Sequence, residues 1–147
     1  MKVSIGSDHA GYKLKGFLAG WLRDAGYDVA DVGAWSEESS DYPDFAATVA
    51  RAVASGVADR GVLVCGTGVG MSLAANRVSG VRAAAVSEPV TARLAREHND
   101  ANIVCLGARI VGPEVAIDVV RTFLGTAFSN GERHVRRIGK IAELEQR

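Results

Sequence analysis

Net charge, cysteine and long apolar runs are all scarce in this 147-residue sequence. The 17 basic and 17 acidic residues cancel, and no basic tract or acidic tail is present, which argues against nucleic-acid binding and against a solvating arm. No apolar run approaches the roughly 18 residues of a membrane span, and residues 1–6 are too short for a signal peptide. We therefore expect a soluble cytoplasmic protein with no membrane partner.

Cysteine occurs only twice, as Cys65 and Cys105, each expected at the end of a buried strand. In a reducing compartment this usage favours free thiols, and Cys105 is expected to fill core space. The two cysteines and the histidines His9, His98 and His134 show none of the close pairwise spacings of zinc ligands. The sequence therefore predicts neither a disulfide nor a metal site.

Hydrophobic periodicity alternates between strand and helix along the whole chain. Strands are expected over 2–7, 27–33, 61–65, 81–86 and 102–106, with the alanine-rich 81–86 tightly packed. Helices are expected between them, then over 113–125, with Ala116, Val119, Val120 and Phe123 inward, and finally over about 131–146. No repeat or linker interrupts this order, so the sequence predicts a single α/β domain over 1–147. Its fold class is a doubly wound, Rossmann-like, five-stranded parallel sheet with helices on both faces.

The most informative stretch is 61–76, in which an apolar run ends at Cys65 and a glycine loop opens a helix. Glycines at Gly66, Gly68 and Gly70 let backbone N–H groups approach an anion, and a thiol beside such N–H groups has a reason to ionise. Met71 stands where a P-loop needs lysine, where a phosphatase loop needs arginine and where a dinucleotide fingerprint needs glycine. The dinucleotide alternative is weakened but not excluded, because an acid follows at about the expected distance. A strand–helix turn without chemistry also stays open.

Other polar groups follow the expected strands, at the sheet edge where ligands bind in this fold class. They are Asp8 and His9, Ser87 and Glu88, and Gly107 to Arg109. Asp8 could equally be a helix cap. The polar groups together favour proton abstraction next to a carbonyl in a small phosphorylated substrate.

The chain's later candidates each have a plainer interpretation. His98 could be only a cation at a helix carboxyl end. Arg133 and Arg137 share a helix face that is either solvated or a phosphate clamp. His134 is expected to point elsewhere, as a structural or exposed residue.

Several motifs, in fixed order, resemble the type B ribose-5-phosphate isomerase family, which includes the galactose-6-phosphate isomerase subunits. They are Gly6-Ser7-Asp8-His9-Ala10-Gly11, Asp41-Tyr42-Pro43, Cys65-Gly66-Thr67-Gly68-Val69-Gly70, Ser87-Glu88-Pro89, residues 97–102, Gly107-Ala108-Arg109 and residues 131–134. The resemblance runs from residue 2 to about 141. It implies isomerisation of ribose 5-phosphate and ribulose 5-phosphate through an enediolate, in the pentose phosphate pathway, without metal or organic cofactor.

The resemblance also implies catalytic roles. Cys65 is the base that moves the proton between C2 and C1; some family members carry a glutamate base at the position of Met71. Asp8 and His98 open the furanose ring, and the Thr67 hydroxyl assists proton movement between the two oxygens.

The implied substrate-binding residues are His9, Tyr42, Gly66, Gly68, Gly70, Asn99, Arg109, Arg133 and Arg137. The backbone from Gly66 to Gly70, with Asn99, forms the anion hole, and the arginines and His9 hold the phosphate. In the family the active site lies between subunits, with His98 and Asn99 coming from the partner. We therefore expect a homodimer, or a tetramer built from two dimers, whose last helix packs on its own domain or on the partner.

Two features leave the substrate open. Glu132 replaces a glycine common in the family and places an acid beside the proposed clamp, which puts phosphate affinity in doubt. Allose 6-phosphate, galactose 6-phosphate or a tetrose phosphate remain alternative substrates. A non-catalytic sugar-phosphate-binding module is a further alternative, although it has no need for a thiol at 65 or a histidine at 98.

Overall fold

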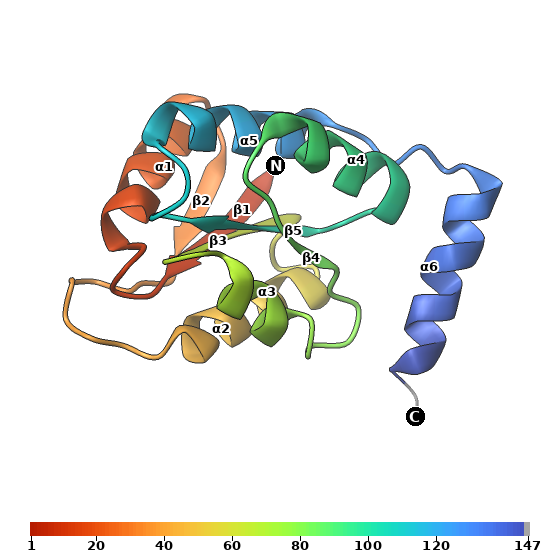
Figure 1. The fold of residues 1–147 in the computed structure, drawn as a ribbon, viewed down its shortest axis with the longest axis horizontal. Helices are drawn as coiled ribbons and strands as arrows, with labels where there is room; N and C mark the ends of the chain where they lie inside the picture. The colour runs from red at the N-terminus through yellow and green to blue at the C-terminus, as the bar shows by residue number, and fades with distance from the viewer. Residues whose placement is uncertain (146–147) are drawn as a thin grey trace.

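The computed structural model describes residues 1–145, in which strands and helices alternate along the chain (Figure 1). The strands are β1 (Lys2–Ser7), β2 (Asp28–Asp31), β3 (Arg60–Cys65), β4 (Ala83–Ala85) and β5 (Ile103–Gly107). The helices are α1 (Tyr12–Asp24), α2 (Tyr42–Ala54), α3 (Val69–Ala75), α4 (Pro89–Asn99), α5 (Pro113–Gly125) and α6 (Glu132–Leu144). All strand pairs are parallel, in the order β2-β1-β3-β5-β4. The predicted α/β doubly wound sheet is confirmed.

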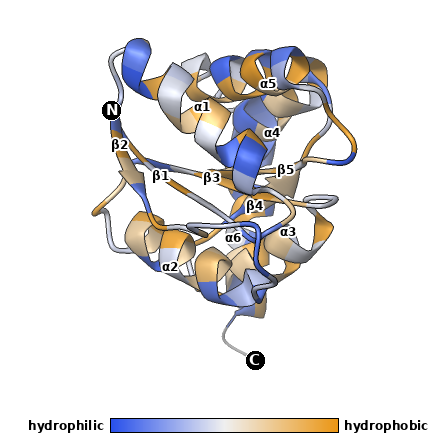
Figure 2. Cartoon of the chain, turned by 90° about the vertical axis from the view of Figure 1, so that its left-hand side faces the viewer, coloured by the Kyte–Doolittle hydropathy of each residue, from blue (hydrophilic) through white to orange (hydrophobic). Residues whose placement is uncertain are grey.

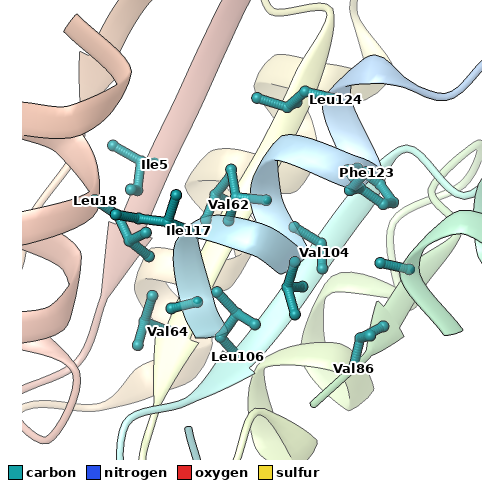
Figure 3. Close-up of a cluster of buried hydrophobic side chains, with 14 of the residues drawn as sticks. Ile5, Leu18, Val62, Val64, Val86, Val104, Leu106, Ile117, Phe123 and Leu124 are labelled. Atoms are coloured by element: carbon teal, nitrogen blue, oxygen red, sulfur yellow. The ribbon is translucent and has the colours of Figure 1, made fainter. Parts of the chain in front are cut away.

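Helices cover both faces of the sheet, as Figures 1 and 2 show: α1, α4 and α5 on one face, α2 and α3 on the other. Each face has its own cluster of buried apolar side chains. In Figure 3, Val62 and Val104 of the central strands lie beside Phe123 and Ile117 of α5. The four residues of α5 predicted to point inward are all fully buried. Burial of each large aliphatic or aromatic side chain contributes about 1.5–3 kcal/mol.

The strand order determines where a ligand can bind. From β1 the chain moves to β2 on one side and then to β3 on the other, so a switch point lies between β1 and β3. Ser7 pairs with Val64 in the parallel register, which brings the residues after β1 next to Cys65. Ligands of doubly wound sheets bind at the carboxyl ends of strands that flank such a point.

Two details differ from the sequence-based expectations. The strand expected over 81–86 is only Ala83–Ala85, and it is not tightly packed, since Ala85 is exposed. The reason is the strand order, which makes β4 an edge strand. Cys105 lies in the middle of β5 rather than at a strand end, and both cysteines are buried free thiols.

The last helix, α6, stands apart from the rest of the domain (Figure 1) and buries none of its residues. Its apolar residues Val135 and Ile141 are about half exposed. Beyond its contact with α4, the segment is tied back by Glu145, whose carboxylate accepts hydrogen bonds from Ser79 and Gly80. The expected range ended at 146, which lies outside the described residues. Within residues 1–145, no helix is long and apolar enough to cross a membrane.

Candidate active site

The glycine loop after β3 presents a backbone N–H to the Cys65 thiol. Gly68 adopts φ +81° and begins the turn into α3, and its N–H donates to Cys65 Sγ at 3.1 Å. A side chain at Gly68 would be strained by this φ, and its Cβ would lie 3.1 Å from the Cys105 carbonyl oxygen. The loop therefore needs glycine here, and its N–H stabilises negative charge on the sulfur.

Arg109 is held against the same loop by the backbone that follows β5. The Ala108 N–H donates to the Cys65 carbonyl at 2.8 Å, and the Arg109 N–H donates to the Gly66 carbonyl at 3.0 Å. The guanidinium then lies over Gly66, since a Cβ at Gly66 would be 3.3 Å from Arg109 Nη1. A permanent cation thus lies over the first residue of the glycine loop, directly after Cys65 in the chain.

Tyr42 and Thr67 complete the surroundings of the glycine loop. Tyr42 is the first residue of α2, and its ring covers Gly70: a Cβ there would lie 2.8 Å from Tyr42 Cζ. Thr67 is exposed, and its hydroxyl accepts the Val69 N–H at 3.3 Å. The Tyr42 ring and the exposed Thr67 hydroxyl therefore flank the glycine loop that follows Cys65.

Asp8 and His9 approach this loop from β1. The Asp8 N–H donates to the Val64 carbonyl at 3.3 Å, next to Cys65 in the chain. Asp8 is 6% exposed, and its Oδ1 accepts the Gly11 N–H at 3.0 Å, which closes the turn before α1 and does not cap that helix, whose N-cap is Gly11. Among the described residues its Oδ2 has no hydrogen-bond partner. One carboxylate can therefore hold the turn and still offer an oxygen to a ligand.

Glu88 also follows a strand, but its carboxylate is occupied. It accepts the N–H groups of Val90 and Thr91 at 2.6 and 2.7 Å and so caps α4. The hydrogen bonds from Thr91 and Val90 lower the pKa of Glu88. Because β4 is separated from β3 by β5, this residue also lies two strands away from Cys65.

His98 and Asn99 lie near the amino-terminal ends of the strands, whereas Cys65 of the same chain lies at the carboxyl-terminal ends. They end α4, just before β5 begins, and the Asn99 carbonyl accepts a hydrogen bond from Arg82, which precedes β4. Cys65 pairs with Gly107 at the other end of β5. The strand alone spans about 13 Å, so one chain does not bring His98 to its own thiol.

His134 packs against His98, in the structural role that was one of the two expected for it. The two rings stack at 4.4 Å with an interplanar angle of 11°. Burial lowers the pKa of His134, and the charges of His98, Arg133 and Arg137 lower it further. The stacking agrees with a structural role, but its partner could not be predicted, because the contact joins α4 to α6, which helix periodicity cannot show.

The α4–α6 contact is reinforced by the linker between α5 and α6. Ser129 donates its N–H and its hydroxyl to the Glu97 carbonyl, at 3.2 and 2.6 Å. Arg133 and Arg137 are exposed, one turn apart on α6. The candidate residues thus form two groups, one around Cys65 and one around His98.

Neither group offers a metal site. Within residues 1–145, no three His, Cys, Asp or Glu side chains cluster as metal ligands would. Cys105 is close to Cys65, but burial raises its pKa, with a further contribution from Cys65, so Cys105 stays a neutral thiol.

Comparison with known proteins identifies the family. The family model described as Ribose/Galactose Isomerase matches residues 3–141. The ribose-5-phosphate isomerase B of Escherichia coli K12 is 47% identical over 146 residues, which are 99% of this chain and 97% of that protein.

Solved structures agree with this match. Clostridium thermocellum ribose-5-phosphate isomerase B superposes with a TM-score of 0.97 at 53% identity, covering 99% of this chain and 98% of that chain. The structure of Mycoplasma genitalium ribose-5-phosphate isomerase B with bound ribulose-5-phosphate superposes with a TM-score of 0.94 at 44% identity, covering 99% of this chain and 96% of that chain. This chain belongs to the Ribose/Galactose Isomerase family.

Proposed function

We propose that this protein is an aldose–ketose isomerase that interconverts ribose 5-phosphate and ribulose 5-phosphate. The observation that carries the proposal is near-complete coverage, at 47 and 53% identity, by two relatives named ribose-5-phosphate isomerase B. A relative at 44% identity has ribulose-5-phosphate bound. The substrate is therefore a phosphorylated sugar and the reaction a proton transfer between adjacent carbons.

Cys65 is the base in this proposal. Isomerisation through an enediolate needs a group that removes a proton next to a carbonyl and donors that hold the developing charge. Cys65 supplies a thiolate whose negative charge the Gly68 N–H stabilises at 3.1 Å. Met71 is fully buried in the same core cluster and cannot ionise, so it offers no alternative base. The Thr67 hydroxyl, exposed on the glycine loop, assists proton movement between the substrate oxygens.

Ring opening and phosphate binding use the remaining candidates. Asp8 carries a carboxylate oxygen with no partner in the described chain and works with His98 to open the furanose. His9, Arg109, Arg133 and Arg137 bind the phosphate, because guanidinium forks match its oxygens. Tyr42 lines the sugar, and the backbone from Gly66 to Gly70, with Asn99, holds the oxyanion.

Two subunits share each site in this proposal. His98 and Asn99 lie about a strand length from their own Cys65, so the partner's copies must complete the site. A cavity of about 640 Å³ between α6 and the β4 edge, lined by Arg82, Ile141 and Leu144 among others, gives a second chain a place to enter. The unburied α6 gives that chain an apolar surface to cover. We therefore propose a homodimer.

Mixed dimers test the shared site. Cys65→Ala and His98→Ala should each be inactive, and random mixing of the two after subunit exchange should restore about one quarter of wild-type sites, since half of the dimers carry one intact site. A mixture that stays inactive, although mass spectrometry shows mixed dimers, contradicts the shared site. Size-exclusion chromatography with light scattering measures the dimer itself.

A substrate panel tests the reaction. Purified protein should turn over ribose 5-phosphate with a higher kcat/KM than allose 6-phosphate, galactose 6-phosphate or a tetrose phosphate. A higher value for one of those sugars would change the substrate and leave the isomerase reaction in place. Binding of every sugar phosphate without turnover would instead favour the non-catalytic module.

We also propose that the protein works in the cytoplasm. The two cysteines, which are both buried free thiols, support this, because disulfides are rare in reducing compartments. Fractionation of cells that express it should recover the isomerase activity with cytoplasmic markers.

A further inference from the structure

The loop between β2 and α2, residues 33–41, touches the active site at both of its ends. At its start, Gly33 and Ala34 are joined to the end of β1: the Ser7 N–H donates to the Gly33 carbonyl and the Ala34 N–H to the Ser7 carbonyl, both at 2.7 Å. At its end, Ser40 meets His9, and Tyr42 follows directly. The middle of the loop, 35–39, is exposed and packs on no core.

Ser40 and His9 bind each other twice. The His9 N–H donates to Ser40 Oγ at 3.1 Å, and the Ser40 N–H donates to His9 Nδ1 at 3.1 Å. A backbone N–H can only donate, so Nδ1 must be the unprotonated ring nitrogen. The proton of the neutral imidazole is then on Nε2. Within residues 1–145, Nε2 has no hydrogen-bond partner.

We infer that Ser40 is a positioning residue that fixes His9 as the Nε2–H tautomer, with this N–H as a ready donor to a phosphate oxygen of the substrate. The identity of that ligand rests on the proposed function. The tautomer does not, because it follows from the Ser40 contact alone. A donor that is already oriented costs less to order when the substrate binds.

Lys15 of α1 holds the other end of the loop and is the second positioning residue. It is 2% exposed, and its Nζ lies 3.0 Å from both carboxylate oxygens of Asp31 and 2.8 Å from the Ala34 carbonyl. Asp31 Oδ1 also accepts the Gly33 N–H at 2.9 Å. The ammonium further lies 5.0 Å from the centre of the Trp35 ring. A buried cation with such a complete set of partners fixes the start of the loop in one place.

The exposed contacts of the loop cannot replace this anchor. Lys13 pairs with Glu37 at 3.3 Å, but both side chains are mostly exposed. Pairs of this kind contribute little. Without Lys15, the backbone hydrogen bonds from Ser7 to Gly33 and Ala34 would remain, but the Ala34 carbonyl and the Trp35 ring would lose their side-chain partner. Lys13 is therefore the matched control for Lys15, two residues away on the same helix.

Nitrogen-15 NMR of the free protein tests the tautomer directly. The wild type should show an acceptor-type Nδ1 and a protonated Nε2 for His9, which His9→Gln identifies by removing the signals. A protonated Nδ1 would overturn the inference. Ser40→Pro, which removes the N–H donor, should give a mixture of tautomers, whereas Ser40→Ala, which keeps it, and Ser39→Ala should retain the Nε2–H form.

The same spectrum tests the anchor. Lys15→Met should give the tautomer mixture and Lys13→Met should not. An unchanged His9 spectrum in folded Lys15→Met would overturn the role of Lys15. If Lys15→Met does not fold, Asp31→Leu, which removes the anchor from the less buried side, is measured in the same way with the same two outcomes.

Kinetics test what the N–H is for. The amide of Gln reaches the place of Nε2, whereas that of Asn reaches only the place of Nδ1. His9→Asn should therefore raise KM about 10- to 100-fold more than His9→Gln, the effect of one hydrogen bond to a charged group, with similar kcat. Equal KM values for the two variants would overturn the phosphate-facing donor. If wild type shows no turnover on any sugar phosphate, the proposed function fails, while the spectrum still decides the tautomer.

Discussion

Gly68→Ala is the substitution for which the structure gives the most specific expectation. The residue adopts φ +81°, its N–H is the donor to Cys65 Sγ, and an added Cβ would lie 3.1 Å from two backbone atoms of β5, in Cys105 and Leu106. Backbone cannot move aside as a flexible side chain can. The loop must therefore shift, and the N–H shifts with it.

Two contributions add up to the expected loss of stability. A left-handed conformation costs a non-glycine residue about 1–2 kcal/mol, and a forced contact with neighbouring backbone costs about 1–3 kcal/mol more. The sum of about 2–5 kcal/mol is a large part of the 5–15 kcal/mol that stabilises a typical domain. Gly80 is the matched control, because it also has φ +81° and nothing within 4 Å of an added Cβ.

Urea unfolding and isomerase kinetics measure both effects. Gly80→Ala should lose only about 1–2 kcal/mol and keep its kcat. Gly68→Ala should lose more and should also lower kcat about 10- to 100-fold, because a hydrogen bond to a charged sulfur contributes about 1.5–3 kcal/mol. If Gly68→Ala keeps the kcat of Gly80→Ala, the N–H of Gly68 does not act on the thiol.

Three further predictions concern α4 and α6. Arg137→Ala should raise KM with little change in kcat, because a phosphate contact holds ground and transition states alike; an unchanged KM, equal to that of Arg136→Ala, would place Arg137 on a solvated face. Arg96 is 2% exposed and donates hydrogen bonds to Asp100, Ala101 and Thr126. Arg96→Met should therefore lower the free energy of unfolding by about 3–5 kcal/mol, whereas Arg93→Met, at an exposed position, should lower it by less than about 1 kcal/mol. Similar losses for the two variants in urea unfolding would contradict the buried network. His134 should titrate below the ordinary histidine pKa of about 6.5, since burial and its charged neighbours lower its pKa. Because the unfolded chain then binds a proton more readily than the folded one, His134 lowers the free energy of unfolding as the pH falls below the unfolded-state pKa. The double variant Arg133→Ala, Arg137→Ala should raise the midpoint of the His134 NMR titration. An unchanged midpoint would exclude the arginine contribution.

Local pattern was enough for most of the fold. The alternation of strand and helix periodicity predicted the α/β class and the inward face of α5. The strand order was not predicted, because it depends on contacts between strands far apart in sequence. That is why the alanine-rich 81–86 was expected inside and forms an edge strand instead.

The candidate site divides in the same way. Asp8, Cys65 and Arg109 could be predicted to lie together, because each follows or ends a strand and the carboxyl ends of parallel strands meet at one side of the sheet. No such rule places the end of α4 against α6, so the stacking of His134 on His98 could not be predicted. Helix spacing places Arg133 and His134 on different parts of α6, and only the position of α4 shows that His134 has a partner there.

The central claim is that Cys65 is the base of a sugar-phosphate isomerase, and initial rates of ribulose 5-phosphate formation from ribose 5-phosphate test it most directly. The comparison is wild type, Cys65→Ala and Cys105→Ala, with a chelator present and with sugar-phosphate binding measured in parallel. We expect Cys105→Ala to keep its kcat, because that thiol is buried and stays neutral. Cys65→Ala should bind the sugar phosphate without measurable turnover, since the lost group acts in the transition state. Near-normal turnover by Cys65→Ala would remove Cys65 from the mechanism.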